Sequence, residues 1–129
     1  TKTHHVCRRQ RQMCIRDSAW GKDKYDAVFT ANSLHIMPLQ AALHFVSHVA
    51  LSLEEEGRFI AYGPFNYNGQ YTSPGNARFD SWLKQQNPSS AIRDFEMLDQ
   101  CAVSAGLVLH RDYAMPANNR LLVWRKPVS

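Results

Sequence analysis

The fold is decided by residues 25–62, which read YDAVFTANSLHIMPLQAALHFVSHVALSLEEEGRFIAY. The short apolar runs at 25–31 and 58–62 are typical of buried strands. A helix is predicted between them over residues 38–53, because Pro38 is tolerated at a first helical position and apolar residues then recur three and four positions apart. The stretch therefore predicts two parallel strands joined by a crossover helix.

Turn and loop signals extend this unit on its C-terminal side. The crossover helix is expected to end at residues 54–57 (EEEG), with Gly57 in the left-handed conformation that often follows a helix. Residues 63–76 (GPFNYNGQYTSPGN) predict a long polar and aromatic loop. A short helix is expected next, over residues 78–86.

The rest of the chain predicts one more helix and two strands. The helix is expected over residues 95–105, with Asp94 as its N-cap and Gly106 as its stop. Strands are expected at 107–113 and 120–125, and the joint between them, MPANN, is too short for a helical crossover. The fold class is therefore α/β, an open sheet that ends in an antiparallel hairpin.

Residues 1–18 (TKTHHVCRRQRQMCIRDS) have no apolar periodicity. We interpret them as an unstructured leader that is not native to the domain, because RQRQMCIRDS resembles a translated sequencing-adapter tract. The folded domain is then expected at residues 19–129. A metal site is disfavoured in the leader, since zinc-binding cysteines lie two to four residues apart and six residues separate these two. Its candidate ligands are His4, His5, Cys7 and Cys14.

The net charge of +4 lies in the N-terminal part of the chain. Residues 1–24 carry seven basic and two acidic side chains, whereas residues 25–129 carry eight and nine. A nucleic-acid-binding domain needs basic residues spread over a folded face, so no nucleic-acid partner is expected unless the leader alone provides one.

Cysteine usage and hydropathy bear on the compartment. Three cysteines in 129 residues argue against a disulfide scaffold and favour a reducing, cytoplasmic location. No apolar run approaches the ~20 residues that span a bilayer, so no membrane partner is expected.

Several catalytic motifs are absent from the sequence. His44 and His48 lie one helical turn apart, but Phe45 stands where a zinc hydrolase helix carries glutamate, so no metal is expected. The chain contains no Gly-x-Gly, which excludes a P-loop and a dinucleotide fingerprint, and no Gly-x-Ser-x-Gly.

Polar clusters follow three of the predicted strand ends. They are NSLH at 32–35, GPFNYN at 63–68 and the pair Asn118 and Asn119. Open α/β sheets bind ligands at the carboxyl ends of their strands, so we expect the 63–76 loop and the 115–119 joint to converge on one ligand site. Turn formation and packing are the alternative roles of these residues.

Four segments resemble the methyltransferase-like protein 26 family, whose members are similar to class I S-adenosylmethionine (SAM)-dependent methyltransferases. The segments are YDAVFTANSLHIMP, YGPFNYNGQYTSPGNARFDSWL, IRDFEML and AMPANNRLLVW, and the resemblance covers about residues 20–129. It implies the C-terminal half of a Rossmann-like sheet, strands four to seven, with the last strand antiparallel. The family's first three strands and glycine-rich cofactor turn have no counterpart here.

The resemblance also implies roles for particular residues, with SAM as the cofactor of the complete protein. Its cofactor-binding residues would be Ala31, Asn32, Ser33 and Leu34. Its substrate-binding residues would be His35, Phe65, Asn66, Tyr67, Asn118 and Asn119. His35 is the only group in these clusters with an ordinary pKa near neutrality, and no general base is assigned.

Two functions remain open. The first is methyl transfer from SAM to a small-molecule or protein acceptor in the complete protein, with this chain alone inactive. The second is a non-catalytic interaction fragment that keeps part of the fold. In either case the strand at 25–31 is expected at an exposed sheet edge, where self-association is possible.

Overall fold

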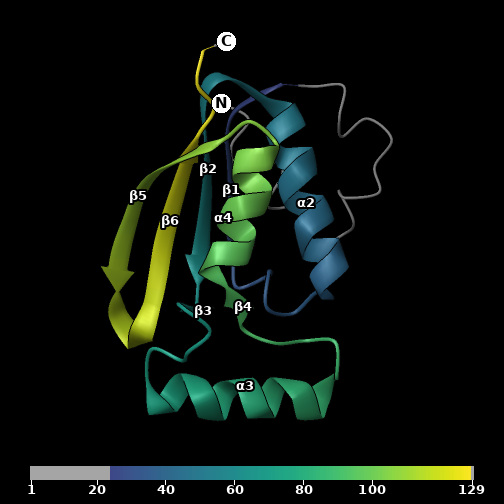
Figure 1. Cartoon of the computed structure of the whole chain (residues 1–129), viewed down its shortest axis with the longest axis vertical. Coiled ribbons are helices and arrows are strands. Elements are labelled where there is room, and N and C mark those ends of the chain that lie inside the picture. Colours follow the sequence, from purple (N-terminus) through teal and green to yellow (C-terminus); the bar gives the residue numbers. More distant parts are fainter. Residues whose placement is uncertain (1–23, 129) are drawn as a thin grey trace.

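The computed structural model describes residues 24–128, and the leader at 1–18 lies outside them. Its main sheet has the strand order β1-β2-β6-β5 (Figure 1). β1 and β2 are parallel and α2 connects them, while β2 with β6 and β6 with β5 are antiparallel. The crossover unit and the terminal hairpin are therefore confirmed. The bounds are β1 Tyr25–Ala31, α2 Leu39–Ser52, β2 Leu53–Gly63, β5 Val108–Met115 and β6 Asn119–Arg125.

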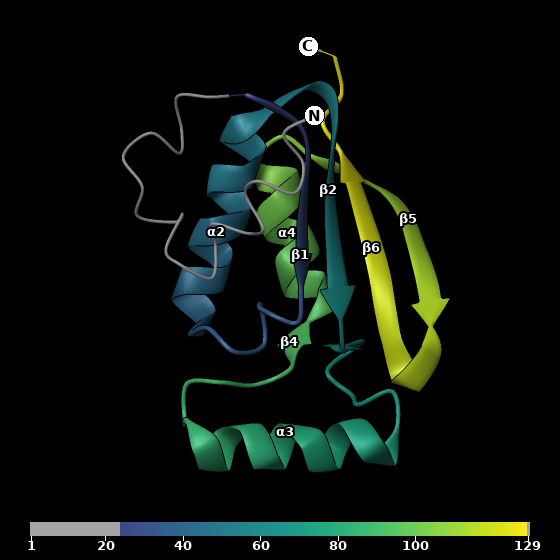
Figure 2. The same cartoon turned by 180° about the vertical axis from the view of Figure 1, so that it is seen from behind.

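Two helices cover one face of this sheet. α2 and α4 (Phe95–Ser104) lie side by side on it in both views (Figures 1 and 2). The core is formed where they meet the strands: Phe45 of α2 packs edge-on against Phe59 of β2, and Phe59 stacks on Trp124 of β6 with ring centroids 5.4 Å apart. The Trp124 indole also donates a hydrogen bond to Asp99 of α4, at 2.9 Å, which fastens this helix to the sheet. No helix within residues 24–128 is long and apolar enough to cross a bilayer.

A third helix and a second, small sheet lie at the end of the main sheet. α3 (Pro74–Gln86) runs across the ends of the strands (Figure 1). β3 (Phe65–Asn66) and β4 (Arg93–Asp94) pair in parallel and connect it to the body. The prediction of a loop to residue 76 was wrong, because Ser73 caps the helix by accepting from the Asn76 N–H at 3.0 Å and Pro74 starts it.

The predicted end of the crossover helix was also wrong. α2 ends at Ser52, and β2 begins at the next residue, so Gly57 lies inside a strand. Between Tyr25 and Ala27 the pairing register with β2 shifts, and Glu56 takes the positive φ of 67° at this bulge. A Cβ on Gly57 would lie 2.8 Å from the Glu54 carbonyl oxygen, which explains the glycine by steric contact.

The predicted end of the helix expected over residues 95–105 is confirmed in part. α4 ends at Ser104, and Gly106 has the positive φ of 102° expected of a residue that terminates a helix. Asp94 occupies the N-cap position, but its side chain makes no capping hydrogen bond. β1 lies at the edge of the described sheet as expected, and self-association through this edge stays a prediction.

Replacing Gly57 by alanine should destabilise the fold by about 1–3 kcal/mol, the usual range for overpacking, because the new Cβ meets backbone that cannot move aside. Urea unfolding followed by circular dichroism measures the change. Gly75→Ala is the matched control, since a Cβ there meets only side-chain atoms at 3.7 Å or more. Equal stability of the two variants would contradict the steric explanation.

Candidate functional site

A cleft of about 410 Å³ opens at the carboxyl ends of β1 and β2. It lies between the first turns of α3 and the turn η2 (Pro116–Asn118) that joins β5 to β6. The expected convergence of the 63–76 segment with the 115–119 joint is therefore confirmed. The lining residues are Asn32, Pro64, Gly75, Asn76, Phe79, Ala117, Asn118 and Asn119.

Three lining residues have left-handed backbone conformations. The φ angles are 56° at Asn32, 62° at Ala117 and 61° at Asn118. Asparagine tolerates this region, but alanine does so at a cost of about 1–2 kcal/mol. The surrounding hairpin holds Ala117 there, because the Asn119 N–H closes the turn by donating to the Pro116 carbonyl. The cleft thus has a strained wall, as ligand-binding sites often do.

Two asparagine side chains connect the walls of the cleft. The Asn76 amide nitrogen donates to Thr72 Oγ1 at 2.9 Å and to the Asn118 carbonyl oxygen at 3.4 Å. The Asn119 amide nitrogen donates to Tyr62 Oη and to the Pro116 carbonyl, both at 3.3 Å. The turn between β5 and β6 is therefore fixed to α3 on one side and to β2 on the other.

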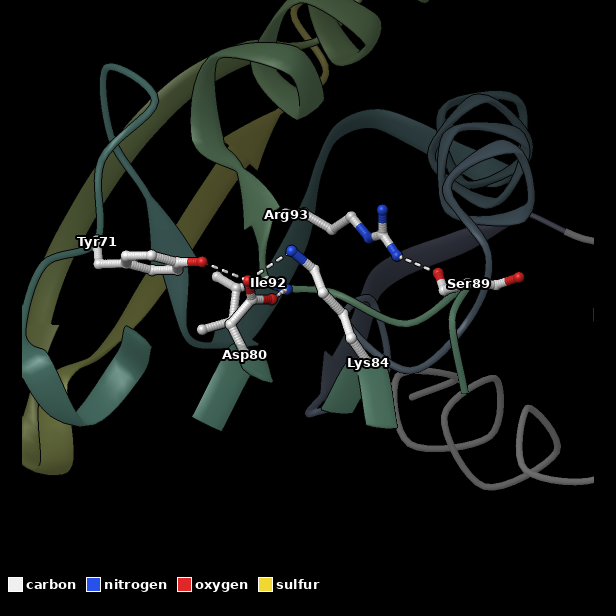
Figure 3. A network of polar contacts seen from close by, with 6 residues as sticks. All are labelled: Tyr71, Asp80, Lys84, Ser89, Ile92 and Arg93. Carbon is white, nitrogen blue, oxygen red and sulfur yellow. Dashed lines mark hydrogen bonds and ion pairs between the residues drawn. The ribbon is translucent and has the colours of Figure 1, made fainter. Parts of the chain in front are cut away.

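Asp80 anchors α3 against the body of the protein (Figure 3). Its buried carboxylate accepts from Tyr71 Oη at 2.5 Å and from the Ile92 N–H at 2.8 Å, and Lys84 Nζ lies 3.0 Å away. Burial opposes ionisation, but these hydrogen bonds and the Lys84 charge outweigh it, so the pKa of Asp80 lies below its ordinary value. The ionised carboxylate thus holds α3, and with it Asn76 and Phe79, in place.

Arg93 of β4 pins the segment that follows β1. Its guanidinium donates to the carbonyl oxygens of Leu34 at 3.2 Å, Met37 at 3.1 Å and Ser89 at 2.8 Å, the last of which is drawn in Figure 3. Burial lowers the pKa of Arg93 from its usual value. Because the His35 carbonyl also accepts from the Ala91 N–H at 3.0 Å, the segment leading out of Asn32 is fixed along its length.

His35 packs behind a cleft wall and does not line the cleft. Its side chain is 5% exposed and meets the Phe79 ring edge-on, with centroids 5.4 Å apart. Burial, and then the charge of Arg93, lowers the pKa of His35 to about 4. The imidazole is therefore neutral at pH 7 and a weak base, unlike the ordinary histidine that the sequence suggested.

The remaining aromatic candidates belong to the packing around the cleft. Phe65 is buried in the core. Tyr67 stacks on Phe95, and its hydroxyl donates to Asp112 Oδ2 at 2.9 Å. Burial, together with this hydrogen bond, raises the pKa of Tyr67 well above its usual value. Arg120 lies over the Tyr67 ring and forms an ion pair with Asp112 at 2.9 Å.

Of the residues to which the resemblance gave roles, the cleft brings together Asn32, Asn118 and Asn119. Outside its lining lie Ala31, Ser33, Leu34, His35, Phe65, Asn66 and Tyr67. Asn66 Oδ1 is buried, and no described residue donates to it. The cleft lining also includes residues to which no role was assigned from the sequence: Pro64, Gly75, Asn76, Phe79 and Ala117. Ser73 before Pro74 is a helix-start signal that could have placed Asn76 and Phe79 three positions apart on one helix face.

The other candidate ligands and nucleophiles lie away from the cleft. The Nε2 atoms of His44 and His48 are 2.8 Å apart on α2, and Cys101 Sγ donates to the Leu43 carbonyl oxygen at 3.4 Å. Within residues 24–128, no three histidine, cysteine or acidic side chains are grouped so that they could hold a metal ion.

The unfolding free energy should fall as pH is lowered from about 6.5 to about 4. In that window the unfolded chain binds a proton at His35, whereas the folded chain does not. The unfolding free energy at about pH 4 is therefore lower than that above pH 6.5 by roughly 3 kcal/mol at most. Urea unfolding across this pH range measures the slope. His35→Gln should flatten it, whereas His110→Gln, at an exposed site, should change it less. An unchanged slope in His35→Gln would disprove the buried neutral imidazole.

Solved structures with a similar fold include two proteins described as O-methyltransferases and one solved with SAM. An O-methyltransferase family protein from Burkholderia thailandensis has a TM-score of 0.75 and 14% identity, over 85% of this chain and 32% of that one. A putative O-methyltransferase from Nostoc punctiforme has a TM-score of 0.67 and 21% identity, over 81% of this chain and 32% of that one. LepI, solved in complex with SAM, has a TM-score of 0.66 and 19% identity, over 81% of this chain and 27% of that one.

These likenesses show that the chain has the fold of these proteins, and the chain spans about a third of their length. The family comparison is more direct, because it rests on the sequence. The family described as "Protein of unknown function (DUF938)" matches residues 6–126, nearly the whole chain. The chain therefore belongs to the DUF938 family.

Proposed function

We propose that the cleft is the acceptor side of a SAM-dependent O-methyltransferase. The observation that carries this proposal is the place of the cleft, at the carboxyl ends of the parallel strands β1 and β2, where open α/β sheets bind their ligands. The similarity to O-methyltransferase structures supports it. Membership of the methyltransferase-like protein 26 family, suggested by the four sequence segments, is part of the same proposal.

Of the four residues assigned to SAM, Asn32 fits a ligand best. Its side chain lines the cleft, and its N–H donates to the Tyr62 carbonyl at 2.9 Å, which fixes the backbone. The Ser33 hydroxyl is engaged with the Ala31 carbonyl, and the Leu34 side chain is buried. The Asn32 amide would therefore provide the polar side-chain contact, and the other three residues would shape the site.

Bound SAM supplies an electrophilic methyl group on a positively charged sulfur. The residues of this chain would hold the acceptor in line with that methyl group and keep water out, which is the main catalytic contribution in such a displacement. The Asn118 and Asn119 amides would orient the acceptor, and Phe79 would provide an apolar wall. His35 would support Phe79 from behind, and we assign it no proton transfer.

In a full-length family member, changing the equivalents of Asn118 to glycine and Asn119 to alanine should lower kcat/KM for methyl transfer by roughly tenfold or more, the loss of about one hydrogen bond to the acceptor. Glycine at the first position keeps the left-handed backbone. The SAM dissociation constant, measured by calorimetry on the same variants, should stay within about twofold of wild type. Loss of SAM binding would instead move these residues to the cofactor side.

The chain of 129 residues should bind SAM no more tightly than millimolar. The described cleft offers two or three hydrogen bonds of about 0.5–1.5 kcal/mol each, against an association cost of at least about 4 kcal/mol. Calorimetry on the chain, with a full-length relative as the positive control, measures this. Micromolar binding would show that a complete cofactor site exists within these residues.

A further inference from the structure

We infer that the cleft selects an uncharged, planar acceptor that carries a hydroxyl group, such as a phenol. This inference rests on the proposed function, because it names the substrate class of the same site. It is carried by the orientation of two amide side chains, by the lining of the cleft and by one fixed aromatic ring.

The orientation of Asn76 is set by the protein. Its Nδ2 contacts a backbone carbonyl oxygen, that of Asn118, and a carbonyl can only accept, so this atom must be the amide nitrogen. Both of its hydrogens are engaged, by Asn118 and by Thr72. No described residue donates to Oδ1 of Asn76, although the side chain is only 6% exposed and lines the cleft. Asn76 therefore offers a ligand a hydrogen-bond acceptor.

The orientation of the Asn119 side chain is also set by a backbone carbonyl. Its Nδ2 contacts the Pro116 carbonyl oxygen and Tyr62 Oη, which uses both amide hydrogens. Its Oδ1 accepts from no residue that the structure describes. The cleft thus has two amide oxygens held in fixed positions, and a ligand that meets both must bring a hydrogen-bond donor.

The lining of the cleft carries no charge. None of its eight residues is ionisable. No charge in the lining would therefore offset the free-energy cost of desolvating a carboxylate or phosphate ligand. The side-chain amide groups of Asn32 and Asn118 have no hydrogen-bond partner within residues 24–128 and can turn either end toward a ligand. Arg78 lies beside Gly75 at the start of α3, outside the lining, and is the cation to consider as an alternative anchor.

The shape of the preferred ligand follows from Phe79. Its ring is held on two sides, by a stacked contact with Trp82 at 6.0 Å between centroids and by the edge contact with His35. A fixed aromatic face favours a flat ring in the cleft. A hydroxyl on that ring would donate its hydrogen bond to Asn76 or Asn119, which fixes the position of the hydroxyl oxygen.

The probes are phenol, anisole and benzoate, titrated into the chain of 129 residues and followed by amide shifts in NMR spectra. Phenol should bind in the millimolar range and move the signals of the Asn76 and Asn119 side chains. Anisole has the same ring without the donor and should bind roughly tenfold more weakly, the effect of about one hydrogen bond. Benzoate should bind at least as weakly as anisole.

Two variants test the origin of the preference. The double variant Asn76→Ala with Asn119→Ala removes both acceptors and should bring the affinities for phenol and anisole within about threefold of each other. Asn68→Gly is the control, because Asn68 is exposed, has a positive φ and lies outside the cleft, so the preference should persist. The ligand series on the unchanged chain decides the matter if a variant fails to fold.

Three results would overturn the inference: no shifts at the cleft with tens of millimolar phenol, anisole binding as tightly as phenol, or benzoate binding that Arg78→Gln abolishes. The last would assign the cleft to anions. These titrations need neither SAM nor turnover. A negative result would therefore contradict this inference without contradicting the proposed function. Methyl transfer by a full-length relative without the phenol preference would remove only the substrate class.

Discussion

The buried guanidinium of Arg93 is the constraint on which the geometry of the cleft depends. A buried cation is unfavourable unless its donors are satisfied, and here three backbone carbonyls accept from it. Two of these carbonyls belong to the segment after β1 and the third, that of Ser89, to the connection between α3 and β4. One side chain therefore sets the distance between Asn32, at the end of β1, and the helix that carries the opposite wall.

Burial, and then the same charge, lowers the pKa of His35. An imidazole that is buried near a guanidinium is held neutral, and its contact with Phe79 then becomes one of packing. Nearby, the strained left-handed backbone of Ala117 lowers the stability of the fold. Both features place rigid, uncharged groups around the cleft. They are what a site requires when it positions a ligand without exchanging protons with it.

The sequence predicted the elements whose signals are local. The helical spacing between Leu39 and Leu53 and the short joint MPANN were enough for the crossover unit and the hairpin. The bulge near Gly57 could not be predicted, because it belongs to the pairing of β1 with β2 and a Cβ at Gly57 would meet a carbonyl that is distant in the sequence, that of Asp26, in addition to Glu54. Likewise the burial of His35 depends on α3 and β4, which are far away in the chain, so the local sequence placed it among the substrate-binding residues. Asn76 was missed for a simpler reason, since it was assigned to a loop and its side chain had no expected direction.

The strand order identifies a fold on which several different reactions can be carried out. The residues that line the cleft restrict the set of these reactions more than the fold does. A sulfonium methyl donor carries its own activated leaving group, so an acceptor-side wall needs no metal and no strong base to contribute to transfer. It needs to fix the nucleophile, and alignment of bound reactants can supply most of the barrier reduction in such a step. Amide oxygens locked by backbone carbonyls meet that need better than titratable side chains, because their direction does not change with pH. The polar groups of this cleft are of that kind at Asn76 and Asn119, so under the proposed methyl transfer their part would be positioning rather than acid–base catalysis.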